Sequence, residues 1–217
     1  MKILKFLVSV VFVGVFLEGC TYAMKVNNLD EYYSSSGYLS KKISIGIVNN
    51  GQGQISEKHI DEIVFQLRAM NQFTEVQYPL SSKSKKPDFV IEIGPRIKYD
   101  GSGLNFLINW PGVYIFMPGW NGYKYTADIK TEIKYVSEKG QPVEKRYEML
   151  FKANQSEFDR TWTVPADWFL TFGVSSLIGG FFVTSFDEDV QPEFFRYYSQ
   201  PYAKFIANKI VVDLSTL

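Results

Sequence analysis

The chain has 217 residues, a length typical of one domain, and its 23 basic side chains balance its 23 acidic ones. This balance argues against a nucleic-acid-binding protein, because such proteins carry an excess of positive charge. Apolar residues make up 46% of the chain, which excludes a wholly disordered protein, and aromatic residues are unusually frequent at 17%. The one cysteine excludes an intramolecular disulfide framework and any metal site built from several cysteines.

The N-terminal segment has the pattern of a signal peptide. Two lysines precede an uncharged apolar run, residues 6–17, which is too short to span a bilayer comfortably. The run ends in the sequence Leu17-Glu18-Gly19-Cys20. This sequence resembles the lipobox of bacterial lipoproteins, although Glu18 departs from the family's pattern. The resemblance implies that residues 1–19 are removed and that Cys20 is diacylated, which anchors the chain in a membrane. The alternative is an uncleaved anchor helix with a buried cysteine.

The lipobox also predicts where the protein resides. Residues 20–40 are expected to form the lipidated N-terminus and a polar tether, and residues 41–217 a single periplasmic domain. Thr21 follows the cysteine, and the absence of Asp at this position resembles the outer-membrane sorting pattern of enteric-type bacteria. We therefore expect a lipid-anchored protein of the cell envelope, at the outer membrane and facing the periplasm.

The first half of this domain contains a strand, a helix and two further strands. Alternating isoleucines predict a strand at 42–48, and Ser56 is expected to cap the helix that follows. Apolar residues at spacings of three or four give this helix one apolar stripe. Short strands are expected at 73–78 and 88–97, and Pro95 favours an edge or bulge position for the second.

The clearest pattern is a long antiparallel hairpin. Apolar and polar residues alternate from Tyr125 to Tyr135, a turn follows at 138–141, and the alternation resumes at 147–153. A C-terminal helix begins near Pro192 and is expected to be interrupted at Pro201.

These elements together predict an α+β fold: a single domain with a mixed or antiparallel sheet, a long hairpin, one helix packed after the first strand, and C-terminal helices. Their order behind a lipobox resembles the small periplasmic envelope-assembly and transport-auxiliary lipoproteins with the TolB N-terminal type of fold, over roughly residues 42–160. The lack of any catalytic motif favours a noncatalytic module.

No residue pattern predicts a catalytic, metal or cofactor site. His59 is the only histidine, and its helical neighbours place it on a polar face, so we expect a solvated side chain. The sequence from Gly51 to Ser56 lies between a strand and a helix but lacks the third glycine of a dinucleotide fingerprint, which favours a plain turn. The acidic residues at 187–189 and Glu193 suit a helix N-terminus better than a calcium site.

Two segments, 101–123 and 168–186, carry no charge and hold many aromatic residues. Three alternatives remain open: ordinary core, a surface that contacts a membrane or partner, or a transmembrane helix. Proline and glycine residues in the segments argue against the helix. The candidate contact residues are Phe106, Trp110, Phe116, Trp120, Trp168, Phe169, Phe181 and Phe182.

The sequence thus predicts an envelope lipoprotein that acts as a noncatalytic binding, assembly or transport-auxiliary module. The expected partners are the membrane, through lipid on Cys20, and an envelope protein or lipid. No cofactor, metal or nucleic acid is expected. The alternative function is that of an envelope glycan hydrolase with an Asp/Glu pair, which an aromatic cleft holding two carboxylates would favour.

Overall fold

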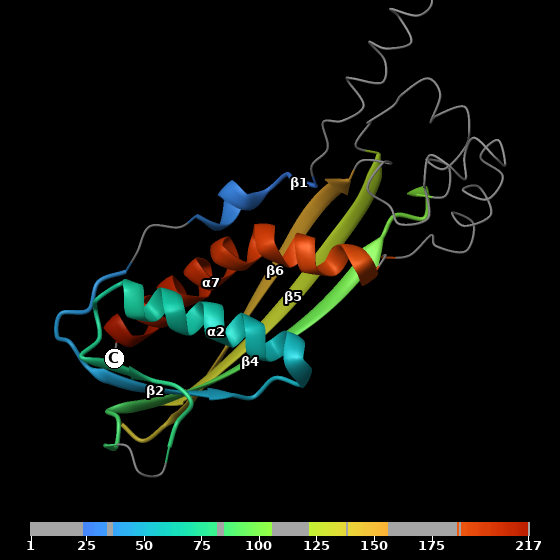
Figure 1. The fold of residues 1–217 in the computed structure, drawn as a ribbon. Coiled ribbons are helices and arrows are strands. Elements are labelled where there is room, and N and C mark those ends of the chain that lie inside the picture. The colour runs from blue at the N-terminus through green and yellow to red at the C-terminus, as the bar shows by residue number, and fades with distance from the viewer. Residues whose placement is uncertain are drawn as a thin grey trace, which may run out of the picture. The chain divides into compact units, whose positions relative to one another are not determined.

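A computed structural model describes residues 24–33, 37–81, 85–105, 122–137, 139–155, 186 and 188–216. In these residues the strands are β1 (Lys25–Val26), β2 (Ser44–Asn49), β3 (Glu75–Gln77), β4 (Phe89–Gly101), β5 (Tyr123–Val136) and β6 (Pro142–Gln155). The helices are α2 (Gly53–Ala69) and α7 (Gln191–Ser215), with short 3-10 turns at Leu29–Tyr32 and Glu188–Val190 (Figure 1). The strands form one mixed sheet in the order β1-β6-β5-β4-β2-β3. The predicted α+β class is confirmed.

The contacts divide the chain into two compact units, described separately below. Unit 1 comprises Met1–Asn27, Tyr99–Thr126 and Lys152–Phe194, and unit 2 comprises Asn28–Lys98, Ala127–Phe151 and Phe195–Leu217. Strands β4, β5 and β6 and helix α7 contribute residues to both units.

In unit 2, ion pairs across the exposed face define the register of the predicted hairpin. Lys130 pairs with Glu148, Glu132 with Arg146, and Lys134 with Glu144. One residue number rises as its partner's falls, so β5 and β6 run antiparallel, as the alternating pattern predicts. Strand β2 runs parallel to both β3 and β4.

Helices α2 and α7 cover one face of the sheet in unit 2 (Figure 1). The apolar stripe of α2 is buried through Ile60, Ile63, Val64 and Leu67. Tyr198 of α7 stacks on Phe151 of β6 at 5.0 Å between ring centroids, and the Tyr202 hydroxyl lies 3.0 Å from Thr131 Oγ1 of β5. The alternation along β5 and β6 places apolar side chains under these helices and charged ones on the opposite face.

Pro95 lies in an interior strand, which corrects the expectation of an edge or bulge. Strand β4 has β5 on one side and β2 on the other. The Ile93 carbonyl accepts a hydrogen bond from the Asn50 backbone N–H, so Ile93 directs its backbone groups toward β2. Pro95, two residues further on, faces the same side, but β2 has already ended at Asn49. Proline has no backbone N–H, but the β2–β4 ladder requires no hydrogen bond from this position.

Pro201 does not interrupt the C-terminal helix, so the prediction of several C-terminal helices was wrong. Helix α7 is continuous from Gln191 to Ser215 with Pro201 inside it. An interior proline costs about 3 kcal/mol. Burial offsets this cost, because the helix buries large side chains on both sides of the proline: Phe194, Tyr198, Tyr202, Ile206 and Ile210.

In unit 2, side chains cover exposed backbone along β3 and β6. The Arg68 guanidinium donates to the Val76 carbonyl at 3.1 Å. The Asn28 amide donates to the Leu150 carbonyl at 2.7 Å, and the Leu150 N–H donates to the Tyr32 hydroxyl at 2.9 Å. Because these backbone groups at the sheet edge are already hydrogen-bonded, they oppose the addition of a strand from another chain.

Part of the predicted tether is folded. In unit 1, Lys25 pairs with Asn154 and Val26 with Ala153, so β1 extends the sheet beside β6. In unit 2, Leu29–Tyr32 form a 3-10 turn. The composition of this stretch is polar, but its backbone pairing depends on β6, which lies more than a hundred residues later in the chain.

Candidate functional site

The residues that the sequence analysis assigns to lipid attachment and to membrane or partner contact all lie outside the described residues. They are Cys20, Phe106, Trp110, Phe116, Trp120, Trp168, Phe169, Phe181 and Phe182. The described residues that flank them can be placed, and those nearest to each segment belong to unit 1.

The first apolar segment leaves β4 and returns to β5 at one point. The Asn105 amide donates to the Lys124 carbonyl at 3.1 Å, and the Lys124 N–H donates to Asn105 Oδ1 at 3.0 Å. The Ser102 N–H donates to the same carbonyl at 3.0 Å. The Asn105 side chain is buried, and it makes with Lys124 the pair of hydrogen bonds that the backbone of a neighbouring strand would make. Nothing in the sequence singles it out, because it is one polar residue within an apolar run.

The second apolar segment ends against the same strands. Phe186, its last residue, stacks on Tyr99 of β4 with ring centroids 4.8 Å apart. Phe186 also makes a T-shaped contact with Tyr125 of β5, with ring centroids 5.3 Å apart. Tyr99 in turn lies 6.3 Å from Phe194 of α7. Aromatic pairs of this kind add about 0.5–1.5 kcal/mol to the burial of their area, so they hold the chain here as it enters the last helix.

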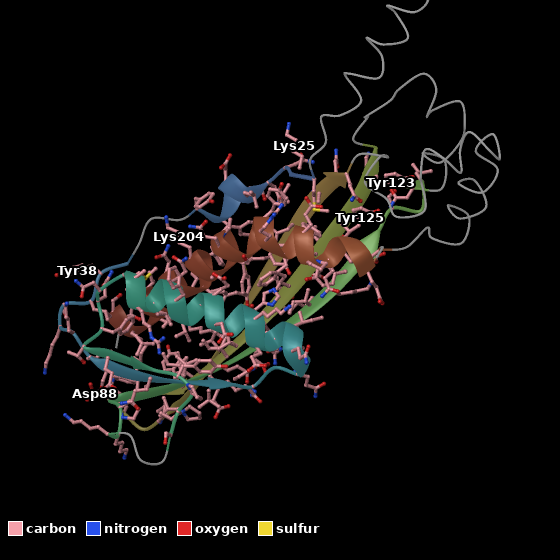
Figure 2. The ribbon with its side chains drawn as sticks, viewed as in Figure 1. Lys25, Tyr38, Asp88, Tyr123, Tyr125 and Lys204 are labelled. Atoms are coloured by element: carbon pink, nitrogen blue, oxygen red, sulfur yellow. The ribbon has the colours of Figure 1, made fainter. Side chains whose placement is uncertain are left out.

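The chain segment that follows Cys20 enters unit 1 beside these flanks. The Asn27 N–H donates to the Lys152 carbonyl at 2.9 Å and continues the pairing of β1 with β6. Four residues lie between Cys20 and Lys25, and the stretch from one to the other spans at most about 18 Å. Figure 2 shows Lys25 together with Tyr123 and Tyr125, all of unit 1. Cys20 and both apolar segments therefore connect to described residues of unit 1.

His59 is a buried structural residue, which corrects the expectation of a solvated side chain. Its Nδ1 lies 2.6 Å from the Ile55 carbonyl, which only accepts, so Nδ1 carries the proton. Its Nε2 then accepts from the Tyr198 hydroxyl at 2.9 Å. The rings of Phe195 and Tyr202 lie against the imidazole. Burial lowers the pKa of His59 to about 4, because imidazolium would lose its water there.

Ser56 does not cap helix α2, which corrects the expectation for the glycine-containing turn before this helix. The helix begins at Gly53, and the Asn49 side chain organises the turn: Asn49 Oδ1 accepts from the Gly51 N–H at 2.8 Å and from the Ser56 hydroxyl at 2.9 Å. A side chain on Gly51 would collide with Ser56, so this glycine is required for packing.

A groove of about 480 Å³ lies between α2 and the chain after β3 in unit 2. Its walls include the carboxylates of Glu57 and Asp61, the 63%-exposed ring of Phe65, and Tyr78. Burial, followed by the charges of Asp61 and Glu57, raises the pKa of Tyr78. The two carboxylates stand four residues apart on one helix, so they lie on the same wall of the groove. Glycoside hydrolysis needs carboxylates that flank the scissile bond from two sides.

The described residues contain no helix long and apolar enough to cross a membrane. They also contain no group of three or more histidine, cysteine or acidic residues placed to hold a metal ion. Asp187 lies outside this set, and Glu193 lies in the first turn of α7, where a negative charge favours the helix dipole.

No protein-family model matches the sequence, and a comparison with curated proteins found no match. Among solved structures, the chain is similar to the crystal structure of the rare lipoprotein B from Shewanella oneidensis. The match has a TM-score of 0.31 and 8% sequence identity, and it covers 62% of this chain and 87% of that one. A TM-score of this size does not establish a common fold.

Proposed function

We propose that the chain is a lipid-anchored protein of the bacterial cell envelope that acts as a noncatalytic binding, assembly or transport-auxiliary module. The proposal places the protein at the outer membrane, facing the periplasm, with diacylated Cys20 as its anchor. Its partners are the membrane and an envelope protein or lipid.

One observation supports this proposal most directly. The chain reaches Cys20 within five residues of β1, and the described flanks of both aromatic segments belong to the same unit. An acylated cysteine requires the nearby protein surface to stay close to the bilayer, and aromatic side chains favour the membrane interface. The position of the anchor and the composition of the segments therefore agree.

The anchor is tested by Cys20→Ser, with Thr21→Ser as the matched control beside it. Cells fed a labelled fatty acid should label the natural protein and the Thr21→Ser variant, but not Cys20→Ser, which should be mislocalised. Unchanged labelling of Cys20→Ser would refute the lipobox assignment. Membrane association without labelling would show that the apolar segments hold the protein instead.

The apolar segments are tested by truncating Trp110, Trp120 and Phe182 to Ala, one at a time. Side chains at a contact surface should leave the free energy of unfolding within about 0.5 kcal/mol of the natural value and reduce binding to envelope membranes. Side chains in a core should each cost about 3–5 kcal/mol. Thermal melting and vesicle binding measured on the same samples separate these outcomes, and three large stability losses without a separable binding loss would contradict the contact surface.

Glycan hydrolysis is the second candidate function, and the groove at Glu57 and Asp61 is where it would be tested, because carboxylates and aromatic rings meet there. Its test is the release of reducing ends from cell-wall glycan by the natural protein and by Glu57→Gln and Asp61→Asn. The single-wall placement of the two carboxylates leads us to expect no release. Release that either substitution abolishes would replace the noncatalytic proposal.

A further inference from the structure

One edge of the sheet in unit 2 carries backbone groups that no described strand pairs with. Strand β6 has β5 on one side, and on its other side β1 pairs only with Ala153 and Asn154. Among the described residues, the first part of β6, residues 142–148, therefore forms an open edge. An open edge of this kind is a template for the addition of one more strand.

The hydrogen bonds of Leu150 show which residues of β6 face this edge. Its N–H donates to the Tyr32 hydroxyl, and its carbonyl accepts from the same hydroxyl, so both of its backbone groups point away from β5. Along an antiparallel strand, every second residue points its backbone groups to the same side. Glu144, Arg146 and Glu148 therefore also present their N–H and C=O groups outward. No described residue donates to or accepts from these backbone groups.

The three outward-facing residues carry charges of alternating sign on the outer face of the sheet. The side chain of Arg146 is 74% exposed, and those of Glu144 and Glu148 are exposed as well. Opposite charges that face each other across two strands stabilise the pair, whereas like charges destabilise it. The edge therefore disfavours strands without matching charges and favours one whose charges alternate in the complementary order.

A second copy of the same edge has this complementary order. When two copies pair antiparallel around Lys145, Glu144 of each copy lies opposite Arg146 of the other. Two-fold symmetry makes this contact twice. A pairing around Arg146 instead places like charges opposite each other at every outward-facing position. The sequence of charges thus selects the register around Lys145 over its neighbour.

The length of the open edge fits the same register. Pro142 is the first residue of β6, and pairing around Lys145 places it opposite Glu148 of the second copy. The paired stretch then ends before Leu150, whose backbone groups already bond to another part of the chain. Proline has no N–H to donate, but it occupies the end of the paired stretch, where its carbonyl still accepts.

We propose that two copies of this chain pair along residues 142–148 of β6, antiparallel and around a two-fold axis at Lys145, so that their sheets join. This inference goes beyond the proposed function and requires no lipid anchor. Lys145 faces its own copy across the axis on the other side of the sheet. This repulsion between like charges weakens the pairing and keeps it reversible.

The two-fold axis is tested by crosslinking at position 145. The two copies of this position form a pair without hydrogen bonds, with Cα atoms about 4.5 Å apart, a distance that a disulfide spans. Full-length Lys145→Cys treated with a mild oxidant should therefore form a disulfide between two copies, and mass spectrometry of the linked peptides assigns it to position 145. Lys130→Cys is the matched control, because Lys130 is exposed but lies on β5, at least about 14 Å from its copy. No disulfide at position 145, or equal yields at both positions, would overturn the inference.

Charge variants in the Lys145→Cys background test the register. Glu144→Arg places two positive side chains opposite each other, and Arg146→Glu places two negative ones, so each should lower the disulfide yield about tenfold. An equal mixture of the two variants should restore the yield, because each glutamate of one copy then faces an arginine of the other. Mixing leaves every contact within each chain unchanged, so this restoration separates pairing from misfolding. Single variants without effect, or a mixture without restoration, would refute the pairing.

Discussion

The buried imidazole of His59 makes a sharp prediction about stability and pH. The unfolded chain binds a proton at this histidine near pH 6.5, whereas the folded chain resists protonation until about pH 4. The pKa of His59 is lower in the folded chain than in the unfolded chain. The stability that neutral His59 contributes is therefore fully present above pH 6.5 and is lost as the pH falls toward 4. At pH 4.5 this linkage amounts to about 2.5 kcal/mol, a large fraction of the stability of a typical domain.

The assay is urea unfolding at pH 7 and pH 4.5, followed by circular dichroism, on the natural protein and on His59→Gln. Glutamine stays neutral at both pH values, so its loss of stability in acid measures the contribution of all other groups. The natural protein should lose about 2.5 kcal/mol more than the variant. Because His59 is the only histidine, its ring signals in a magnetic-resonance titration are unambiguous. Equal acid losses, or a folded-state midpoint near pH 6.5, would refute the reasoning.

Three further predictions concern hydrogen bonds in the described residues, each checked by equilibrium unfolding. Tyr202→Phe and Thr131→Val should each lower the free energy of unfolding by about 1–2 kcal/mol, because either change leaves one buried hydroxyl without its partner. The double variant should lose less than the sum of the two, and additive losses would contradict this. Tyr147→Phe should cost about 1 kcal/mol, because it removes the 2.7 Å bond to Asp213, and no measurable loss would contradict the bond. Asn105→Ala should cost about 1–3 kcal/mol by stranding the backbone groups it pairs with, and a loss below 0.5 kcal/mol would show that water replaces it.

The α+β class and the central hairpin follow from local patterns in the sequence. Alternation from Tyr125 to Tyr135 requires an extended strand with one buried face, and every buried residue of β5 within this stretch lies at a predicted alternate position. The apolar stripe of α2 likewise follows from its spacing, and Ile60 and Ile63 of this stripe are buried. In both cases the period of the side chains along the backbone is enough, because neighbours in the chain decide which face is apolar.

Other features depend on partners that are distant in the chain. His59 has polar neighbours on its helix, but its side chain is buried, because Tyr198 contacts it from a position 139 residues later in the chain. The polar stretch around Lys25 becomes a strand only because β6 offers it an edge. Pro95 is tolerated in an interior strand because β2 ends just before it. Local sequence sets the pattern of each element, whereas burial and hydrogen-bond pairing are properties of contacts between elements, so only the tertiary structure decides them.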